Sequence, residues 1–106
     1  MTKILCVEDN ADNLLMLQRR LTRRGFEVTI STDGAESLEW AKTLLPDVIV
    51  MDLNLPGLDG WEATRRLKNQ PETKDIPIIV LTADTTKKSH EKALAAGCDD
   101  FDTKPV

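Results

Sequence analysis

The sequence has few of the residues that build metal and redox centres from sulfur and imidazole. Its 106 residues include two cysteines, Cys6 and Cys98, and one histidine, His90. The spacing of the cysteines matches no zinc or dithiol motif. Cys6 lies in the apolar run ILCV, so we expect a small buried side chain with a reduced thiol. We expect His90 to be a surface residue rather than a catalytic group.

Long apolar segments, glycine-rich loops and an excess of positive charge are also missing. The N-terminal stretch MTKILCVEDN has too short an apolar run for a signal peptide, and nothing approaches membrane-spanning length. No glycine-rich loop precedes a Lys and a Ser or Thr, which argues against a P-loop nucleotide site. The net charge of −4 argues against direct nucleic-acid binding, because phosphate backbones attract clustered Lys and Arg. These absences favour a cytoplasmic protein that binds neither membrane nor nucleic acid.

The chain length fits one domain, which we expect to span residues 1–106 because no linker or repeat interrupts it. Short apolar runs, typical of buried strands, alternate with stretches of helical periodicity. The runs lie at 4–7, 28–30, 48–51, 78–81 and, more weakly, around Phe101. The helical stripes span 14–21, 35–45, 63–67 and 93–96, and they end at Gly25, Pro46, Pro71 and Gly97. The alternation predicts an α/β fold, a doubly wound parallel sheet of five strands with four helices.

Polar residues stand at the carboxyl ends of the predicted strands. Glu8 and Asp9 follow the first strand, Asp52 ends the third, and Thr82 and Lys104 end the fourth and fifth. The carboxyl ends of parallel strands lie at one edge of the sheet, where ligands of such folds bind. Adjacent carboxylates require a cation, and hard oxygen ligands without His or Cys select Mg²⁺. A hydroxyl and an ammonium beside them suit a phosphoryl group, and a carboxylate can itself be the nucleophile that accepts it.

Each of these residues also has an ordinary structural explanation. Glu8, Asp9 and Asn10 include N-cap material for the next helix, Thr82 can cap a turn, and Lys104 can be a solvated charge. Their joint position at strand ends favours a shared site. The sequence therefore predicts a Mg²⁺-dependent phosphoryl acceptor.

Four motifs surround these residues in a fixed order. They are VEDN after the first strand, VIVMDLNLPGLDGWE around the third, IIVLTA at the fourth and AAGCDDFDTKP leading through the fifth. Together they resemble the motifs of receiver domains from two-component response regulators. The resemblance covers essentially the whole chain and implies a flavodoxin-like sheet of strand order 2-1-3-4-5.

By position, the resemblance implies a role for each carboxylate. Asp52 corresponds to the phosphoacceptor, which would carry a 4-aspartylphosphate. Asp9 corresponds to a direct Mg²⁺ ligand, Glu8 to a ligand through water, and Asn54 to a ligand through its backbone carbonyl. The resemblance therefore implies a Mg²⁺ site built from these residues together with Asp52 itself.

The resemblance also implies a switch. Lys104 would hold a phosphoryl oxygen, Thr82 would move to hydrogen-bond it, and Phe101 would turn inward on activation. The implied function is a response-regulator receiver that takes a phosphoryl group from a histidine kinase or a phosphotransfer protein and changes its partner-binding surface. Self-phosphorylation and dephosphorylation are implied, without turnover of a small molecule.

Two other functions fit parts of the pattern. A Mg²⁺-dependent phosphatase with an aspartate nucleophile has a similar site, but it uses an acid two residues after the nucleophile, where this chain has Asn54. A binding module that ignores phosphate would share the fold, although it would not need the polar residues at the strand ends.

The chain departs from the family pattern near its end. Asp102 stands where many members have an apolar residue, so we expect a short fifth strand or an exposed edge. Members of the family usually continue into another helix after the Lys-Pro pair, and that final helix is missing here. We therefore expect exposed apolar surface, with marginal stability, a homodimer or swapped elements as the result.

Overall fold

A computed structural model describes residues 2–52, 60–82, 91 and 95–103 of the chain. It contains one parallel sheet of five strands in the order β2-β1-β3-β4-β5, which confirms the predicted strand order. The strands are β1 (Lys3–Val7), β2 (Glu27–Ser31), β3 (Val48–Asp52), β4 (Ile78–Thr82) and β5 (Asp100–Thr103). The helices are α1 (Ala11–Arg23), α2 (Gly34–Leu44) and α3 (Gly60–Lys68).

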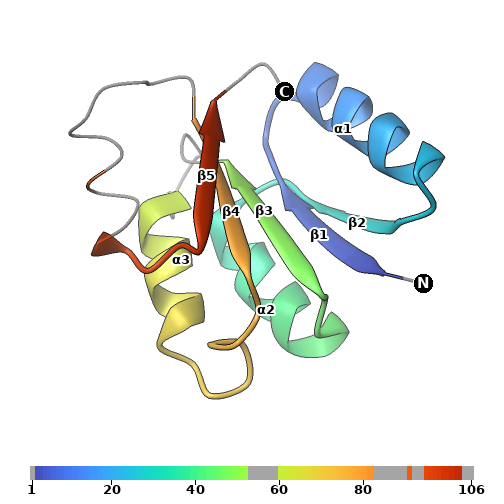
Figure 1. The fold of residues 1–106 in the computed structure, drawn as a ribbon. Helices are drawn as coiled ribbons and strands as arrows, with labels where there is room; N and C mark the ends of the chain where they lie inside the picture. The colour runs from blue at the N-terminus through green and yellow to red at the C-terminus, as the bar shows by residue number, and fades with distance from the viewer. Residues whose placement is uncertain (1, 53–59, 83–90, 92–94, 104–106) are drawn as a thin grey trace.

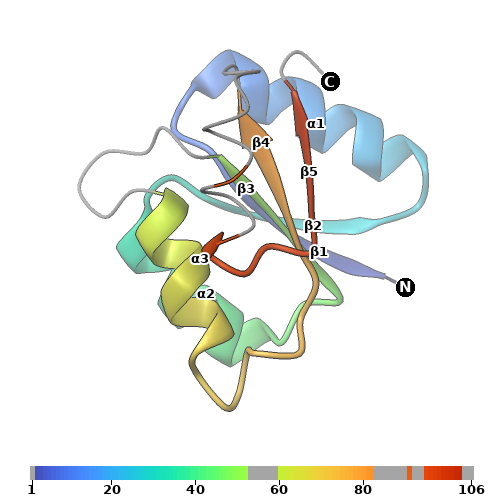
Figure 2. The same cartoon turned by 60° about the vertical axis from the view of Figure 1, so that its left-hand side comes forward.

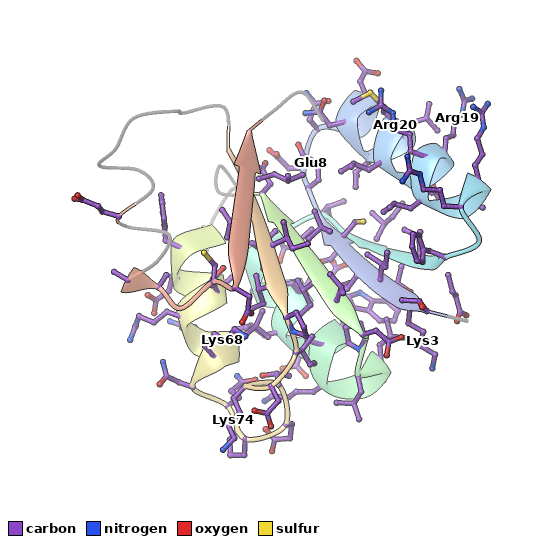
Figure 3. All side chains as sticks on the ribbon, in the orientation of Figure 1. Lys3, Glu8, Arg19, Arg20, Lys68 and Lys74 are labelled. Carbon is purple, nitrogen blue, oxygen red and sulfur yellow. The ribbon has the colours of Figure 1, made fainter. Side chains whose placement is uncertain are left out.

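The helices cover the two faces of the sheet unequally (Figures 1 and 2). α2 and α3 lie together on one face, while α1 is alone on the other face among the described helices. α1 packs against β2, and its outer side carries the exposed Arg19 and Arg20 (Figure 3). None of the described helices is long and apolar enough to cross a membrane.

The main core lies between the sheet and the pair formed by α2 and α3. Side chains alternate between the two faces of a strand, so every second residue of β1, β3 and β4 points into this core. Its most deeply buried members are Leu5, Val7, Ala41, Ile49, Met51, Ala63, Leu67, Ile78 and Val80. Trp61, at the start of α3, is partly buried and packs against the same cluster.

The α1 side of the sheet is less completely covered. Ile4 and Cys6 of β1 are buried there, and Leu17 of α1 is 8% exposed. Val50 and Ile79, on the neighbouring strands, are only half-buried. Among the described residues, α1 therefore covers its face of the sheet less completely than α2 and α3 cover theirs.

The ends of the first two helices show where sequence periodicity succeeds and fails. Gly25 follows α1 with a φ of 88°, so it ends that helix as predicted. The sequence predicts that the second helical stripe includes Leu45, and this prediction is wrong. α2 ends at Leu44, and Leu45 is its C-cap in the left-handed conformation, with a φ of 48°. Pro46 explains the difference, because the residue before a proline is disfavoured in helical conformation.

The C-terminal part of the sheet agrees with the predictions where it is described. β5 has four residues and pairs only with β4, so it is the short edge strand expected from Asp102. The predicted fourth helix falls mostly outside the described residues, although Glu91 and Ala95 are helical. Gly97 follows with a φ of 93°, as expected for a glycine that ends a helix.

Candidate functional site

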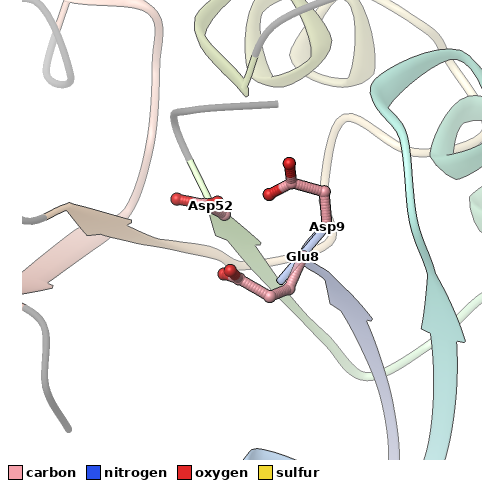
Figure 4. A group of neighbouring side chains, drawn as sticks. All are labelled: Glu8, Asp9 and Asp52. Carbon is pink, nitrogen blue, oxygen red and sulfur yellow. The ribbon is translucent and has the colours of Figure 1, made fainter. Parts of the chain in front are cut away.

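The predicted carboxylates meet at the carboxyl edge of the sheet. β1 and β3 are neighbours in register, with Val7 opposite Met51, so Glu8 and Asp9 emerge beside Asp52. One carboxylate oxygen from each of the three residues lies within 4.8 Å of the others. Figure 4 shows Glu8 and Asp9 leaving the end of β1 close to Asp52 at the end of β3. The adjacency of β1 and β3, which comes from the strand order, brings together residues that are far apart in sequence.

The cluster combines buried and accessible carboxylates. Glu8 and Asp52 are only 1% and 2% exposed, whereas Asp9 is exposed to solvent. Like charges at this separation repel each other, and a bound divalent cation offsets that repulsion. The donor set is oxygen only, and this suits Mg²⁺ or a similar hard cation. The exposed Asp9 leaves the site accessible from the solvent.

Glu8 is held by both the backbone and the first turn of α1. Its N–H donates to Ser31 O at 3.0 Å, which extends the pairing of β1 with β2 by one residue. Its Oε1 accepts from the Asn10 N–H at 3.4 Å and from Asn13 Nδ2 at 3.3 Å. Asn13 was not among the predicted site residues. The sequence signal that could have identified it is an amide side chain in the first turn of the helix that directly follows VEDN.

Two of the remaining predicted residues, Thr82 and Phe101, lie in described strands, and the other two do not. Thr82 ends β4 next to β3, one position beyond Leu81, which is opposite Asp52. Phe101 lies in β5 opposite Val80. Asn54 and Lys104 lie outside the described residues, and Lys104 directly follows Thr103, the β5 partner of Thr82. The backbone therefore brings Thr82 to the same sheet edge as the carboxylates.

Comparison with known families identifies the chain. Residues 4–106 match the model of the response regulator receiver domain. The chain belongs to the receiver-domain family of response regulators. The parallel sheet, its strand order and the acidic cluster at the carboxyl edge agree with that assignment. Its place is therefore in two-component signal transduction.

Individual receiver proteins are similar over nearly the whole chain. The response regulator PleD of Caulobacter vibrioides is 38% identical over 98% of this chain, which spans 23% of PleD. The polar-differentiation response regulator DivK of Brucella ovis is 36% identical over 100% of this chain and 87% of DivK. The chain thus corresponds to under a quarter of the first relative and to most of the second.

A solved receiver structure bears on the metal site. The receiver domain of sensor histidine kinase PA1611 from Pseudomonas aeruginosa PAO1 superimposes with a TM-score of 0.92 and 38% identity. The match covers 99% of this chain and 86% of that one, and that structure has a magnesium ion coordinated in its active site cleft. Proteins of this family are phosphoacceptors.

Proposed function

We propose that Asp52 is the residue that this receiver domain phosphorylates. Asp52 ends β3 with 2% of its surface exposed, beside Glu8 and Asp9. The observation that carries the proposal is the group of three carboxylate oxygens within 4.8 Å of one another. A carboxylate in such a group can help to hold a cation and can attack phosphorus.

The proposed donor is a histidine kinase or a phosphotransfer protein. In the transfer, an oxygen of Asp52 forms the new bond to phosphorus while the bond between phosphorus and the donor imidazole nitrogen breaks. The imidazole nitrogen keeps the bonding electron pair. Water later releases inorganic phosphate and restores the carboxylate. The domain therefore acts on itself, and we propose no turnover of a small molecule.

We propose Mg²⁺ as the cation of this site. Glu8, Asp9 and Asp52 would hold it, and the backbone carbonyl of Asn54 would complete the protein ligands. When bound, Mg²⁺ supplies positive charge to the oxygens of the transferring phosphoryl group. The proposal is supported by the oxygen-only donor set and by the accessible Asp9, which leaves a route for ion exchange.

We propose that Lys104, Thr82 and Phe101 carry the signal away from Asp52. Lys104 and Thr82 would contact the phosphoryl oxygens, and Phe101 would change orientation in response. Support comes from the strand register. Thr82 of β4 is opposite Thr103 of β5, and Lys104 is the next residue in the sequence after Thr103. Phosphorylation would then bias two arrangements of β4, β5 and the segments that follow them.

The setting of the domain is proposed on the same basis. We propose one receiver domain over residues 1–106, acting in the cytoplasm through protein contacts rather than on nucleic acid or membrane. The net charge of −4 supports the part of this proposal that concerns nucleic acid, because phosphate backbones attract clustered Lys and Arg.

We also propose that two copies of the chain pair through the α1 side of the sheet. Val48, Val50 and Ile79 are half-buried there, and an apolar face of this kind favours a self-complementary contact. Sedimentation equilibrium over a range of protein concentrations tests this. A dimer is expected at high concentration, and a monomer throughout would overturn the pairing.

Phosphorylation is tested with Mg²⁺ and acetyl phosphate, followed by intact mass spectrometry. Wild type is expected to gain one base-labile phosphoryl group, and Asp52→Asn is expected to gain none. Asp75→Asn, which alters an exposed aspartate outside the cluster, is the matched control and should behave as wild type. An adduct that persists in Asp52→Asn would contradict the assignment of Asp52. No adduct in folded wild type would instead favour a phosphate-blind binding module.

A further inference from the structure

The first turn of α1 is capped in an unusual way. Asn10 is the N-cap, and its Oδ1 accepts the N–H of Asn13 at 3.0 Å. Asn13 is the third residue of the helix, the position from which a Glu or Gln side chain often accepts the N–H of the N-cap residue. Here the Asn10 N–H donates instead to Glu8 Oε1, at 3.4 Å. Glu8 thus replaces the side chain that would normally complete the cap.

The side chain of Asn13 does not accept the N–H of Asn10 but contacts Glu8, which takes that role. Its Nδ2 donates to the same Oε1 of Glu8, at 3.3 Å. Asn10, Asn13 and Glu8 therefore form a closed set of three hydrogen bonds that includes one carboxylate of the acidic cluster. Among the described residues, the Asn10 N–H and Asn13 Nδ2 donate to Oε1, and both belong to the first turn of α1 or its cap. Forming that turn therefore helps to fix the position of this oxygen.

A glutamate in this cluster needs such a restraint more than an aspartate does. Its longer side chain has an additional rotatable bond, so fixing a Glu side chain costs more rotamer entropy than fixing an Asp side chain. Glu8 is 1% exposed, next to Asp9 and Asp52, whose charges repel it. Donors that keep Glu8 in the cluster before a cation arrives would lower the cost of ordering it during binding.

We propose that Asn13 is a positioning residue of the metal site and that it couples metal binding to the first turn of α1. Asn13 acts through Glu8 and contacts no cation itself. The inference rests on the proposed Mg²⁺ site, and it adds a residue to that site and a link from the site to a helix. Partners that orient metal ligands in this way typically account for 10- to 100-fold in affinity.

The coupling is reciprocal. If a formed first turn strengthens Mg²⁺ binding, Mg²⁺ must stabilise that turn by the same factor. The Asn13 N–H, which Asn10 Oδ1 accepts, reports on the turn directly. Its hydrogen exchange in wild type should therefore slow on addition of Mg²⁺, and Asn13→Ala should lose most of this slowing because the link to Glu8 is gone.

Metal affinity is measured by titration calorimetry with MgCl₂ on wild type, Asn13→Ala and Asn13→Gln. We expect Asn13→Ala to bind Mg²⁺ about 10-fold more weakly than wild type. Asn13→Gln keeps an amide donor and should fall between the two. Asn69→Ala is the matched control, because it removes an amide away from the cluster that also makes a hydrogen bond, to Arg65 O at 2.7 Å, and it should bind Mg²⁺ as wild type does.

The outcomes separate this inference from the proposed function. If wild type does not bind Mg²⁺, the metal site itself is wrong and the inference falls with it. If wild type binds Mg²⁺ and Asn13→Ala binds equally well, the role of Asn13 is overturned while the metal site stands. If Mg²⁺ leaves the exchange of the Asn13 N–H unchanged in wild type, the coupling to α1 is overturned. That exchange is measured on wild type, so it tests the coupling even if Asn13→Ala folds poorly.

Discussion

Lys68 Nζ lies 2.6 Å from Asp99 Oδ2, and this ion pair joins the last turn of α3 to the segment before β5. Lys68 Nζ also donates to Ile76 O at 2.8 Å, and the same oxygen of Asp99 accepts the Ile78 N–H at 2.8 Å. The group ties three segments together at the amino ends of β4 and β5. It therefore lies at the opposite edge of the sheet from Glu8 and the acidic cluster (Figure 3).

Removing the charge of Lys68 should destabilise the fold. The Lys68 side chain is 15% exposed, and Lys68→Met keeps most of its length while leaving Asp99 and Ile76 O without this donor. We expect the free energy of unfolding to fall by about 1 kcal/mol. The loss is this small because Asp99 is half exposed, so water screens the ion pair. Urea unfolding measures the change. Lys74→Met, at an exposed position, is the control, and an equal loss there would contradict the role of Lys68.

Asp99 should contribute to the dependence of stability on pH. Burial raises its pKa, but the hydrogen bonds from Lys68 and the Ile78 N–H, with the Lys68 charge, together lower the pKa below the ordinary 3.8. A lowered pKa in the folded state adds stability above the unfolded pKa, and this is lost as pH falls through the folded value. Asp99→Asn should therefore be less stable than wild type at pH 7. Urea unfolding from pH 7 to pH 3 should show the two converging only at the acid end, and a constant difference would contradict this.

Thr64 offers a site for stabilisation. It is 0% exposed, and its Oγ1 has no hydrogen-bond partner among the residues that the structure describes. Burying an unpaired hydroxyl is unfavourable, and valine has nearly the same shape without the polar atom. Thr64→Val should raise the free energy of unfolding by about 1 kcal/mol, measured by thermal or urea unfolding. Thr64→Ser keeps the hydroxyl and loses a methyl group, so it should be less stable than wild type. A destabilised Thr64→Val would mean that the hydroxyl does have a partner.

The thiols should be unreactive in the folded protein. Burial raises the pKa of the Cys6 thiol to about 12, and Cys98 is 8% exposed. Thiol reagents attack the thiolate, which is scarce at such a pKa and shielded by the core. Labelling with a chromogenic disulfide at pH 8 should be slow in native protein and complete for both cysteines in denaturant. Fast native labelling would show that the core opens around Cys6.

Much of the fold and part of the site could be predicted because they depend on local patterns. The alternation of apolar runs and helical stripes leads to a parallel sheet, and this sheet places every strand's carboxyl end at one edge. The strand ends therefore predict that Glu8, Asp9 and Asp52 meet at that edge, and their carboxylate oxygens lie within 4.8 Å of one another. The error at Leu45 arose because an apolar periodicity cannot show that Pro46 takes the preceding residue out of the helix.

The sequence alone determined which chemistry is available: three carboxylates at strand ends, with no His or Cys at those ends, and the motifs of a receiver domain. Only the tertiary structure decided the contacts between segments that are far apart in the sequence. The ion pair of Lys68 with Asp99 depends on how the end of α3 packs beside the segment before β5. That packing is set by many weak core contacts acting together, and no short stretch of sequence encodes it.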